Sequence, residues 1–295
     1  MSKPASHILI GIDGGGTRCR FAIKTNREHH EIVLAGANTH TDRATALTTL
    51  KEGLSALREK AQLSQQDINE ARCYAGLAGI VNRQQAKELE QALPIKALLI
   101  EDDRRGAVVG ALGTDHGAVA GIGTGSFVAR QSQSGLKILG GYGADLGDEA
   151  SGCWLGKMLL GRTLHWLDGL APYSDLIDAA WQRFDADLET LLTFAKQAKP
   201  SQFAELAPLV VEAASANDLN GRVLMSEGAD YILRCLDALS WTPGEPLCLL
   251  GGLAPHYQPH LPANVTASLT PAKGTALDGA LLLAERVAEN AGALS

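Results

Sequence analysis

The feature that most constrains the fold is a glycine-rich turn between two apolar segments, at residues 8–23. The apolar run 8–10 leads through Asp13 into three consecutive glycines, Gly14, Gly15 and Gly16. After Thr17, apolar and polar residues alternate, so the stretch predicts a β-hairpin. Glycines in its turn let backbone amides approach an anion without an intervening Cβ.

Asp13 makes this turn more specific. A carboxylate directly before an anion-binding turn repels phosphate unless a divalent cation lies between them. The stretch therefore favours a loop that binds a magnesium–nucleotide phosphate. An ordinary glycine-rich hairpin turn stays the alternative on this stretch alone.

The same arrangement occurs a second time, at residues 117–130, where the turn contains Gly123, Thr124, Gly125 and Ser126. A duplicated strand, turn and strand suggests two similar lobes that hold one phosphate chain from both sides. Hydroxyl donors would come from Thr17, Thr124 and Ser126. A P-loop is excluded because the chain has no G-x-x-x-x-G-K-[ST] motif. Strand patterns follow both turns, which argues against a Rossmann NAD site.

Acidic residues follow a predicted strand at residues 97–100, in the order Glu101, Asp102, Asp103. In open α/β sheets, ligands bind at the carboxyl ends of strands, so Asp103 is a candidate functional residue. The alternative is a solvated loop whose acids are neutralised by the two arginines that follow.

Residues 140–152 contain five glycines and three acids, directly before a helix predicted to begin near Ser151. This composition fits a loop around a small polar ligand, with Asp148 and Glu149 accepting hydrogen bonds from hydroxyl groups or an ammonium. The same acids also suit a helix N-terminus. Further on, a predicted strand at 247–250 leads into Gly251 and Gly252, where backbone can approach a flat adenine.

The rest of the chain alternates predicted strands and helices, which indicates an α/β protein. The prolines at 255 and 259 argue against a helix carrying His256 and His260, so we expect no metal pair there. Residues 265–269 are predicted as an edge strand, and residues 278–288 as a closing helix.

The bulk properties exclude several classes of protein. A length of 295 residues favours two domains, and a net charge of −7 without a basic run argues against nucleic-acid and membrane partners. No apolar stretch reaches the ~20 residues of a membrane span, and the first residues lack the apolar core of a signal peptide. The five cysteines are scattered without CxxC spacing. We therefore expect a cytoplasmic protein with reduced thiols. As a separate expectation, the protein is a homodimer.

Four motifs occur in order across nearly the whole chain: 13–17, 123–126, 141–149 and 251–252. Together they resemble the BadF/BadG/BcrA/BcrD-type ATPase family of the actin/hexokinase/Hsp70 superfamily, and within it the glucosamine and N-acetylglucosamine kinases. The resemblance implies an α/β, actin-like ATPase fold of two ribonuclease-H-like lobes, with ATP·Mg²⁺ and sugar in the cleft. We place the lobes at residues 1–105 and 106–295. The second lobe would carry a helical insertion, and the last helix (about 278–290) would pack back on the first lobe.

The resemblance also implies roles for individual residues. Asp13 would place Mg²⁺, directly or through water, and Asp103 would accept the proton of the attacking sugar hydroxyl. The ATP-binding residues would be Asp13, Gly14, Gly15, Gly16, Thr17, Arg18, Gly123, Thr124, Gly125, Ser126, Gly251, Gly252 and Ala254. The sugar-binding residues would be Asn38, Thr39, Asp103, Gly141, Tyr142, Gly143, Asp148 and Glu149.

The activity implied is phosphoryl transfer from ATP to the 6-hydroxyl of an amino sugar. Relatives usually carry Lys where Arg18 stands and often Trp where Tyr142 stands, and Glu101 and Asp102 make the surroundings of the base more acidic. An acidic pocket suits a free ammonium, so we expect glucosamine rather than N-acetylglucosamine. The alternatives are an ATP-dependent activator of a dehydratase, disfavoured by the scattered cysteines, and a nucleotide-sensing regulator, disfavoured by Asp103.

Overall fold

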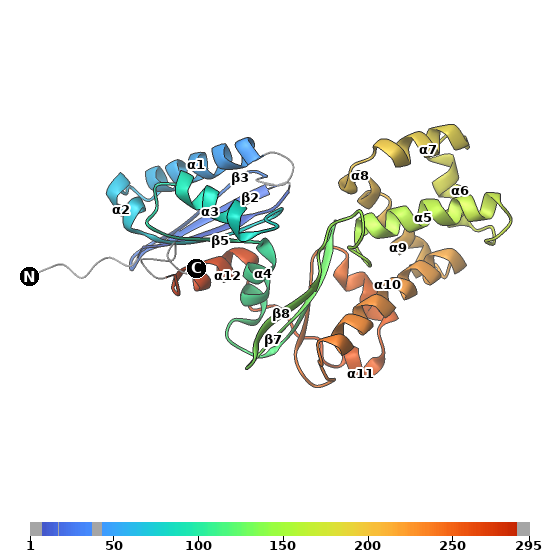
Figure 1. Ribbon diagram of the computed structural model, residues 1–295. Coiled ribbons are helices and arrows are strands. Elements are labelled where there is room, and N and C mark those ends of the chain that lie inside the picture. Colours follow the sequence, from blue (N-terminus) through green and yellow to red (C-terminus); the bar gives the residue numbers. More distant parts are fainter. Residues whose placement is uncertain (1–7, 17, 37–42, 288–295) are drawn as a thin grey trace, which may run out of the picture. The chain divides into compact units, whose positions relative to one another are not determined.

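The computed structural model describes residues 8–16, 18–36 and 43–287, and the chain forms two compact units (Figure 1). The first unit contains residues 1–114 and 272–295, and the second contains residues 115–271. The boundary expected between residues 105 and 106 falls inside a helix of the first unit, α4 (Asp103–Leu112). The chain returns to the first unit near its C-terminal end.

The first unit is built on a five-stranded sheet in the order β3-β2-β1-β4-β5. The hairpin expected from the glycine turn is present as β1 (Leu9–Gly14) and β2 (Arg18–Lys24), and β3 (His29–Ala35) extends it antiparallel. β4 (Arg72–Leu77) and β5 (Ala97–Glu101) run parallel to β1. The carboxyl ends of β1, β4 and β5 therefore lie at the same edge of the sheet.

Alternation along β1 divides the core of this unit between the two faces of the sheet. Ile10 and Ile12 pack with α1 (Arg43–Lys60), α2 (Gln65–Glu70) and α3 (Arg83–Ala92). Leu9 points to the other face, where it packs with α4 and α12 (Ala276–Ala284). Figure 1 shows α1, α2 and α3 on one side of the sheet, and α4 and α12 on the other.

Glycines let α12 lie directly against its neighbours. A Cβ added to Gly279 of α12 would lie 2.0 Å from the backbone oxygen of Gly106 in α4. A Cβ on Gly110 would lie 1.9 Å from the backbone oxygen of Thr275, and one on Gly11 of β1 would lie 2.9 Å from the backbone nitrogen of Leu281. The close packing of α4 and α12 thus depends on the absence of side chains, and α4 is the helix that begins with Asp103.

The second unit has a four-stranded sheet in the order β8-β7-β6-β9. The second glycine hairpin is confirmed as β6 (Gly117–Ile122) and β7 (Ser126–Ser132). β8 (Gly135–Gly140) is antiparallel to β7, and β9 (Leu247–Leu250) is parallel to β6. The expected α/β class is therefore confirmed, with one sheet in each unit.

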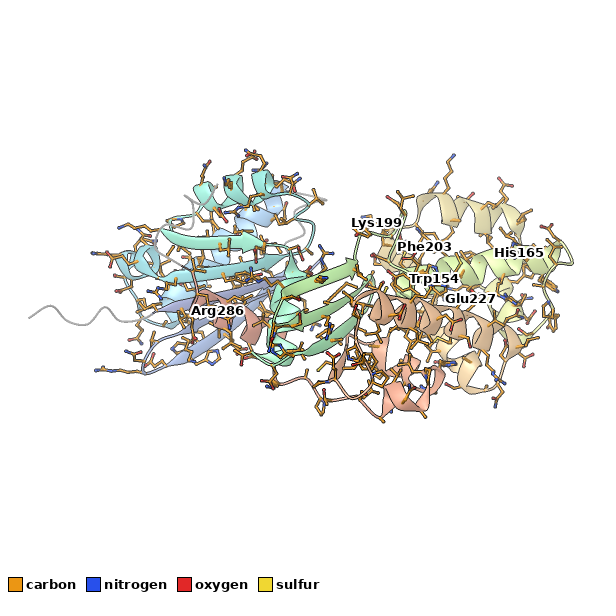
Figure 2. All side chains as sticks on the ribbon, turned by 60° about the horizontal axis from the view of Figure 1, so that its bottom comes forward. Trp154, His165, Lys199, Phe203, Glu227 and Arg286 are labelled. Carbon is orange, nitrogen blue, oxygen red and sulfur yellow. The ribbon has the colours of Figure 1, made fainter. Side chains whose placement is uncertain are left out.

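Between β8 and β9 the chain inserts six helices: α5 (Gly152–Leu167), α6 (Asp175–Gln182), α7 (Leu188–Gln197), α8 (Pro200–Ala204), α9 (Ala207–Ser215) and α10 (Leu219–Ala238). Their aromatic residues belong to the core of the unit, which includes Trp154 of α5 and Phe203 of α8 (Figure 2). The Phe203 ring also packs edge-on against Phe194 at 5.4 Å.

Two local expectations are wrong. Residues 265–269 do not form a strand: the chain forms the short helix α11 (Ala263–Thr266), and Leu269 makes an isolated bridge to Leu247. Residues 254–260 are helical in spite of their two prolines, as the 3₁₀ helix η1 (Ala254–His260). Pro255 lies in its first turn, where a backbone N–H has no helical partner to lose.

Neither histidine of η1 belongs to a metal-binding group. Within residues 8–16, 18–36 and 43–287, no cluster of three or more His, Cys, Asp or Glu side chains has the geometry to hold a metal ion. Over the same residues, no helix has the length and apolar character needed to cross a bilayer.

Candidate functional site

In the first unit, the carboxyl ends of three parallel strands bring two aspartates together. The register places Asp13 of β1 beside Gly76 of β4, and Gly76 beside Glu101 of β5. A Cβ on Gly76 would lie 3.1 Å from the Cα of Asp103, so the glycine allows Asp103 to approach this strand closely. The sequence analysis missed Gly76. A glycine inside a buried strand is itself the signal of such a close approach.

Asp103 has the properties of a general base. Burial of its side chain raises the pKa to about 6, and the neighbouring carboxylates of Asp102 and Asp13 act in the same direction. Among the described residues, no other side chain donates a hydrogen bond to this carboxylate. A carboxylate that titrates near neutral pH and has a free lone pair can accept a proton from a substrate hydroxyl.

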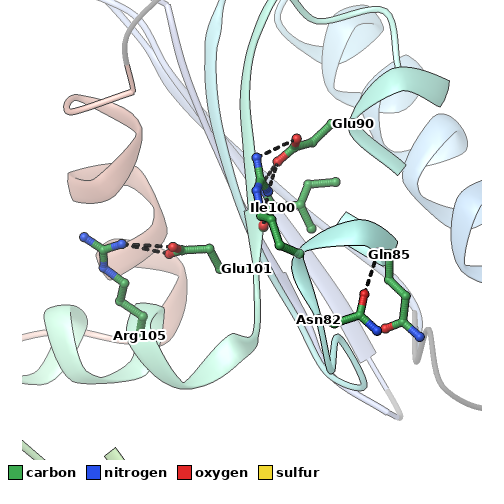
Figure 3. Close-up of polar contacts among 7 residues, drawn as sticks. Asn82, Gln85, Glu90, Ile100, Glu101 and Arg105 are labelled. Carbon is green, nitrogen blue, oxygen red and sulfur yellow. Dashed lines mark hydrogen bonds and ion pairs between the residues drawn. The ribbon is translucent and has the colours of Figure 1, made fainter. Parts of the chain in front are cut away.

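The other two acids of the cluster have arginine partners. Asp102 caps α4: one carboxylate oxygen accepts from the Arg104 backbone amide at 3.0 Å and from Arg104 Nε at 2.8 Å. Both oxygens of Glu101 accept from Arg105 Nη1, at 2.9 and 3.1 Å (Figure 3). The sequence left open which aspartate is the base. Asp102 is held by Arg104 through both of its carboxylate oxygens, so we carry Asp103 forward as the candidate base.

Asp13 lies at the end of β1, opposite Arg20 in the hairpin register. Its Oδ2 is 3.0 Å from Arg20 Nη1. Burial raises the pKa of Asp13, and the hydrogen bond and charge of Arg20 oppose that rise. The glycine turn beyond it is closed by a hydrogen bond from Gly15 N to Arg18 O at 2.9 Å. Gly16 and Arg18 are exposed, whereas Thr17, Asn38 and Thr39 lie outside the described residues.

In the second unit, the turn between β6 and β7 is held by the start of α5. Gly152 N donates to Gly123 O at 2.8 Å, and Cys153 N donates to Thr124 O at 3.2 Å. Thr124 is exposed. The Ser126 hydroxyl, expected to hold phosphate, is buried and donates to the Glu149 carbonyl at 2.6 Å. Its single proton thus holds the next loop in place.

That next loop, residues 141–150, contains most of the residues expected to bind sugar. Asp148 is buried, and its Oδ1 accepts from Gly143 N at 3.2 Å. A Cβ on Gly125 would lie 2.7 Å from Asp148 Oδ2, so a side chain at 125 would require the Asp148 carboxylate to move. Tyr142 is 80% exposed at the tip of the loop. The loop therefore exposes Tyr142 to solvent, while the buried Asp148 fixes the loop.

A cavity of about 540 Å³ adjoins the turn between β6 and β7 within the second unit. One wall comes from the predicted motifs, with Gly123, Thr124 and Gly252. The other lining residues were not predicted from the sequence, because they belong to no motif. They come from α8, from α9, and from the loop and 3₁₀ helix that follow β9. These residues are Ala204, Ala207, Pro208, Val211, Glu212, Leu253 and His256.

Gly251 fixes the turn that follows β9 and leads into the cavity wall at Gly252. It has φ +88°, and a Cβ there would lie 2.3 Å from the backbone oxygen of Ile122 at the end of β6. Both the left-handed backbone and the close approach require glycine. The cavity thus opens at the carboxyl ends of two parallel strands, β6 and β9, where ligands of α/β sheets bind.

The fold and these motifs define the class of the protein. The BadF/BadG/BcrA/BcrD ATPase family matches residues 10–261, so the chain belongs to that family. This confirms the resemblance drawn from the four motifs and the actin-like ATPase fold it implied. Membership in an ATPase family also makes ATP the nucleotide.

Individual relatives match nearly the whole chain. The glucosamine kinase of Vibrio cholerae (serotype O1) is 27% identical over 284 residues, 95% of this chain and 97% of that one. The N-acetyl-D-glucosamine kinase of Dictyostelium discoideum is 26% identical, over 81% of this chain and 80% of its own. A crystal structure from Chromobacterium violaceum, of a candidate N-acetylglucosamine kinase, has 30% identity and a TM-score of 0.85. It covers 95% of this chain and 100% of that one.

Proposed function

We propose that this protein is an ATP-dependent amino-sugar kinase that phosphorylates the 6-hydroxyl of glucosamine, giving glucosamine 6-phosphate and ADP. The observation that carries the proposal is Asp103, a partly buried carboxylate with a pKa near 6, next to Asp13 at the end of a glycine hairpin. The near-full-length relatives named as glucosamine and N-acetylglucosamine kinases support the same substrate class.

The catalytic work assigned to this chain is to position the substrates and move one proton. Phosphoryl transfer demands little covalent chemistry from the protein, so alignment and charge stabilisation provide most of the rate. Asp103 accepts the proton of the sugar hydroxyl as it attacks the γ-phosphate. The glycine turns at 14–16 and 123–125 offer backbone amides to the phosphates, and the 540 Å³ cavity takes the base and ribose.

The donor set of the first unit fits a magnesium ion. Mg²⁺ in kinases is held by one or two carboxylates, with phosphate oxygens and water completing the octahedron. Asp13 and Asp103 lie close enough for each charge to act on the other, and Asp13 would hold the ion. When bound, Mg²⁺ supplies neutralisation of the phosphate charge.

The choice of glucosamine rests on the Vibrio cholerae relative, which matches over a larger share of both chains than the Dictyostelium one does. The argument from an acidic pocket is weaker than the sequence suggested. Glu101 and Asp102 are each paired with an arginine, which leaves Asp103 as the unpaired acid of that cluster. N-acetylglucosamine is therefore the second candidate.

The test of the proposal is ADP release from Mg·ATP with glucosamine, N-acetylglucosamine, N-acetylmannosamine and glucose in parallel. We expect turnover with glucosamine at the highest kcat/KM. A preference for N-acetylglucosamine would keep the class and change the substrate. Binding of ATP without turnover on any of the four sugars would refute the kinase proposal.

The pH dependence of the reaction should reflect Asp103. Because its pKa lies near 6, the carboxyl is protonated at lower pH and cannot accept the hydroxyl proton. We expect kcat to fall about tenfold per pH unit below that value and to be level above it. Steady-state kcat from pH 4.5 to 8.5 measures this; a level profile down to pH 5 would contradict it.

Gly251→Ala is expected to weaken ATP binding about tenfold, or by ~1.4 kcal/mol, because the turn must move to relieve the strain of a left-handed alanine and its clash. The added Cβ would push the turn away from Ile122 and change the shape of the cavity. Titration calorimetry with ATP measures the effect. Gly244→Ala is the matched control: it also has a positive φ, of +101°, but no atom within 4 Å of the added Cβ. Equal losses of affinity in both variants would contradict the role of Gly251.

A further inference from the structure

The end of β5 is held by side chains of α3. β5 is an edge strand, so the backbone groups on its outer side have no neighbouring strand. At Ile100 these groups have side-chain partners: Ile100 N donates to Glu90 Oε1 at 2.8 Å, and Arg83 Nη1 donates to Ile100 O at 3.2 Å. Figure 3 shows Glu90 beside Ile100 and the acidic Glu101 next along the chain.

The two side chains also bind each other. Arg83 and Glu90 form a bidentate ion pair, with Nη1–Oε1 at 2.6 Å and Nη2–Oε2 at 2.9 Å. The Glu90 side chain is only 10% exposed. Bidentate geometry fixes direction as well as distance. Arg83, Glu90 and the Ile100 peptide groups thus form a closed set of hydrogen bonds, which we call the β5 clamp.

The helix that supplies the clamp is itself fixed at its start. Asn82 caps α3 by accepting from Gln85 N at 2.9 Å (Figure 3). The Gln85 side chain in turn accepts from Val81 N at 3.1 Å. Arg83 is the first residue of α3 and Glu90 lies two turns further on, so the clamp ties much of the helix to one peptide of β5.

Ile100 is the last fully buried residue before the candidate base. Its side chain belongs to the core shared with α1 and α3. Beyond it the chain leaves the sheet, Asp102 caps α4, and Asp103 begins that helix. Fixing the backbone of Ile100 therefore fixes the point from which the loop to Asp103 starts.

We propose that Arg83 and Glu90 are positioning residues: they set the place of Asp103 relative to Asp13 by holding the end of β5. The proposal rests on the proposed function, because it gives Asp103 the role of base. Ordinary exposed ion pairs contribute little to a protein. This pair differs because it supplies the hydrogen bonds of an edge-strand peptide three residues before the base.

The experiment compares Glu90→Ala, Glu90→Gln and Arg83→Lys with the unchanged protein. In Glu90→Ala, we expect kcat to fall about 10–100-fold while the KM for ATP stays within about twofold, because the candidate base shifts and the nucleotide cavity does not. When the end of β5 moves, we expect the Asp103 carboxyl to be less buried and further from the Asp13 carboxylate. Both changes lower the pKa of Asp103, so the acid limb of the pH–kcat profile should move to lower pH. Glu90→Gln keeps an oxygen for Ile100 N–H, and Arg83→Lys keeps a charged donor, so both should recover most of the loss.

Glu88→Ala is the matched control. Glu88 lies on the same helix, and among the described residues its partners are Arg43 and Gln84 rather than a residue of β5. It should leave kcat and the acid limb unchanged. A wild-type kcat and acid limb in folded Glu90→Ala would overturn the proposal, and so would an equal loss in Glu88→Ala. If Glu90→Ala fails to fold, Arg83→Ala takes its place. A lower kcat and a shifted acid limb in Arg83→Ala, recovered in Arg83→Lys, would support the clamp. A wild-type kcat and acid limb in folded Arg83→Ala would overturn it.

Two readouts need no substrate and separate this proposal from the proposed function. The Asp103 carboxyl can be titrated by carbon NMR, and amide exchange at Ile100 can be followed by mass spectrometry. In Glu90→Ala we expect a lower pKa at Asp103 and faster exchange at Ile100. An unchanged titration and exchange rate would refute the clamp even in an active kinase. Changes in both would support the clamp even if no amino sugar were phosphorylated.

Discussion

Asp103→Asn is expected to lower kcat by about 10²–10⁴-fold, the usual contribution of a general base, while ATP still binds. The amide keeps the size of the side chain, so the loop and α4 stay in place. Steady-state kinetics and calorimetry with ATP measure the two effects. Asp102→Asn is the control: asparagine also caps helices well, so the loss of turnover there should be far smaller. Wild-type turnover in Asp103→Asn would remove this residue from the role of base.

The same variant should be more stable than the unchanged protein at pH 8. The folded pKa of Asp103 is raised from 3.8 to about 6, so the folded state disfavours the ionised form. Stability from this carboxyl is fully present below pH ~4 and is lost as the pH rises through about 6. Asparagine does not ionise and avoids that loss. The melting temperatures of the two proteins should therefore converge near pH 4 and separate above pH 6; the opposite order at pH 8 would contradict the burial of a charged Asp103.

Gly279→Ala is expected to destabilise the first unit by about 2–4 kcal/mol, through overpacking that outweighs a gain of up to ~1 kcal/mol in helix propensity. The added Cβ would lie 2.0 Å from Gly106 O and 2.4 Å from Gly110 N, and both are backbone atoms that only a shift of the helix can relieve. Chemical denaturation measures the change.

Gly161→Ala provides the comparison. Gly161 lies within α5, and an added Cβ has no atom within 4 Å. Because only the higher helix propensity of alanine acts here, the free energy of unfolding of this variant should rise by about 0.5–1 kcal/mol. Similar stabilities of the two alanine variants would show that α4 and α12 tolerate a wider separation than their glycines indicate.

The sequence predicts those parts of the protein that depend on neighbours along the chain. Both glycine hairpins follow from short runs of alternating residues around small turns, and the strand ending in residues 101–103 follows from an apolar run. The prediction for residues 265–269 fails because their apolar pattern is too short to separate strand from helix. Pro262 precedes α11, and its carbonyl accepts from Val265 N and Thr266 N, which favours the helix.

The parts of the site that depend on tertiary structure could not be predicted in this way. Gly76 matters because Asp103 lies over it, and Arg83 matters because Ile100 is on an edge strand. The cavity wall from α8 and α9 consists of common residues without a motif. The Ser126 hydroxyl could donate to a phosphate, yet it donates its hydrogen bond to a backbone carbonyl 23 residues further along the chain.

The discontinuity of the first unit has a consequence during protein synthesis. Strand β1 is made at the beginning and α12 near the end, with all of residues 115–271 between them. Until α12 leaves the ribosome, the apolar face of the sheet around Leu9 and Tyr74 is covered by α4 alone and lacks the part that α12 covers. At ~5–20 residues per second, synthesis of residues 115–271 alone takes roughly 8–31 s. The second unit is contiguous in sequence and can fold during that time, so the half that contains the candidate base is completed last and is the half more exposed to aggregation.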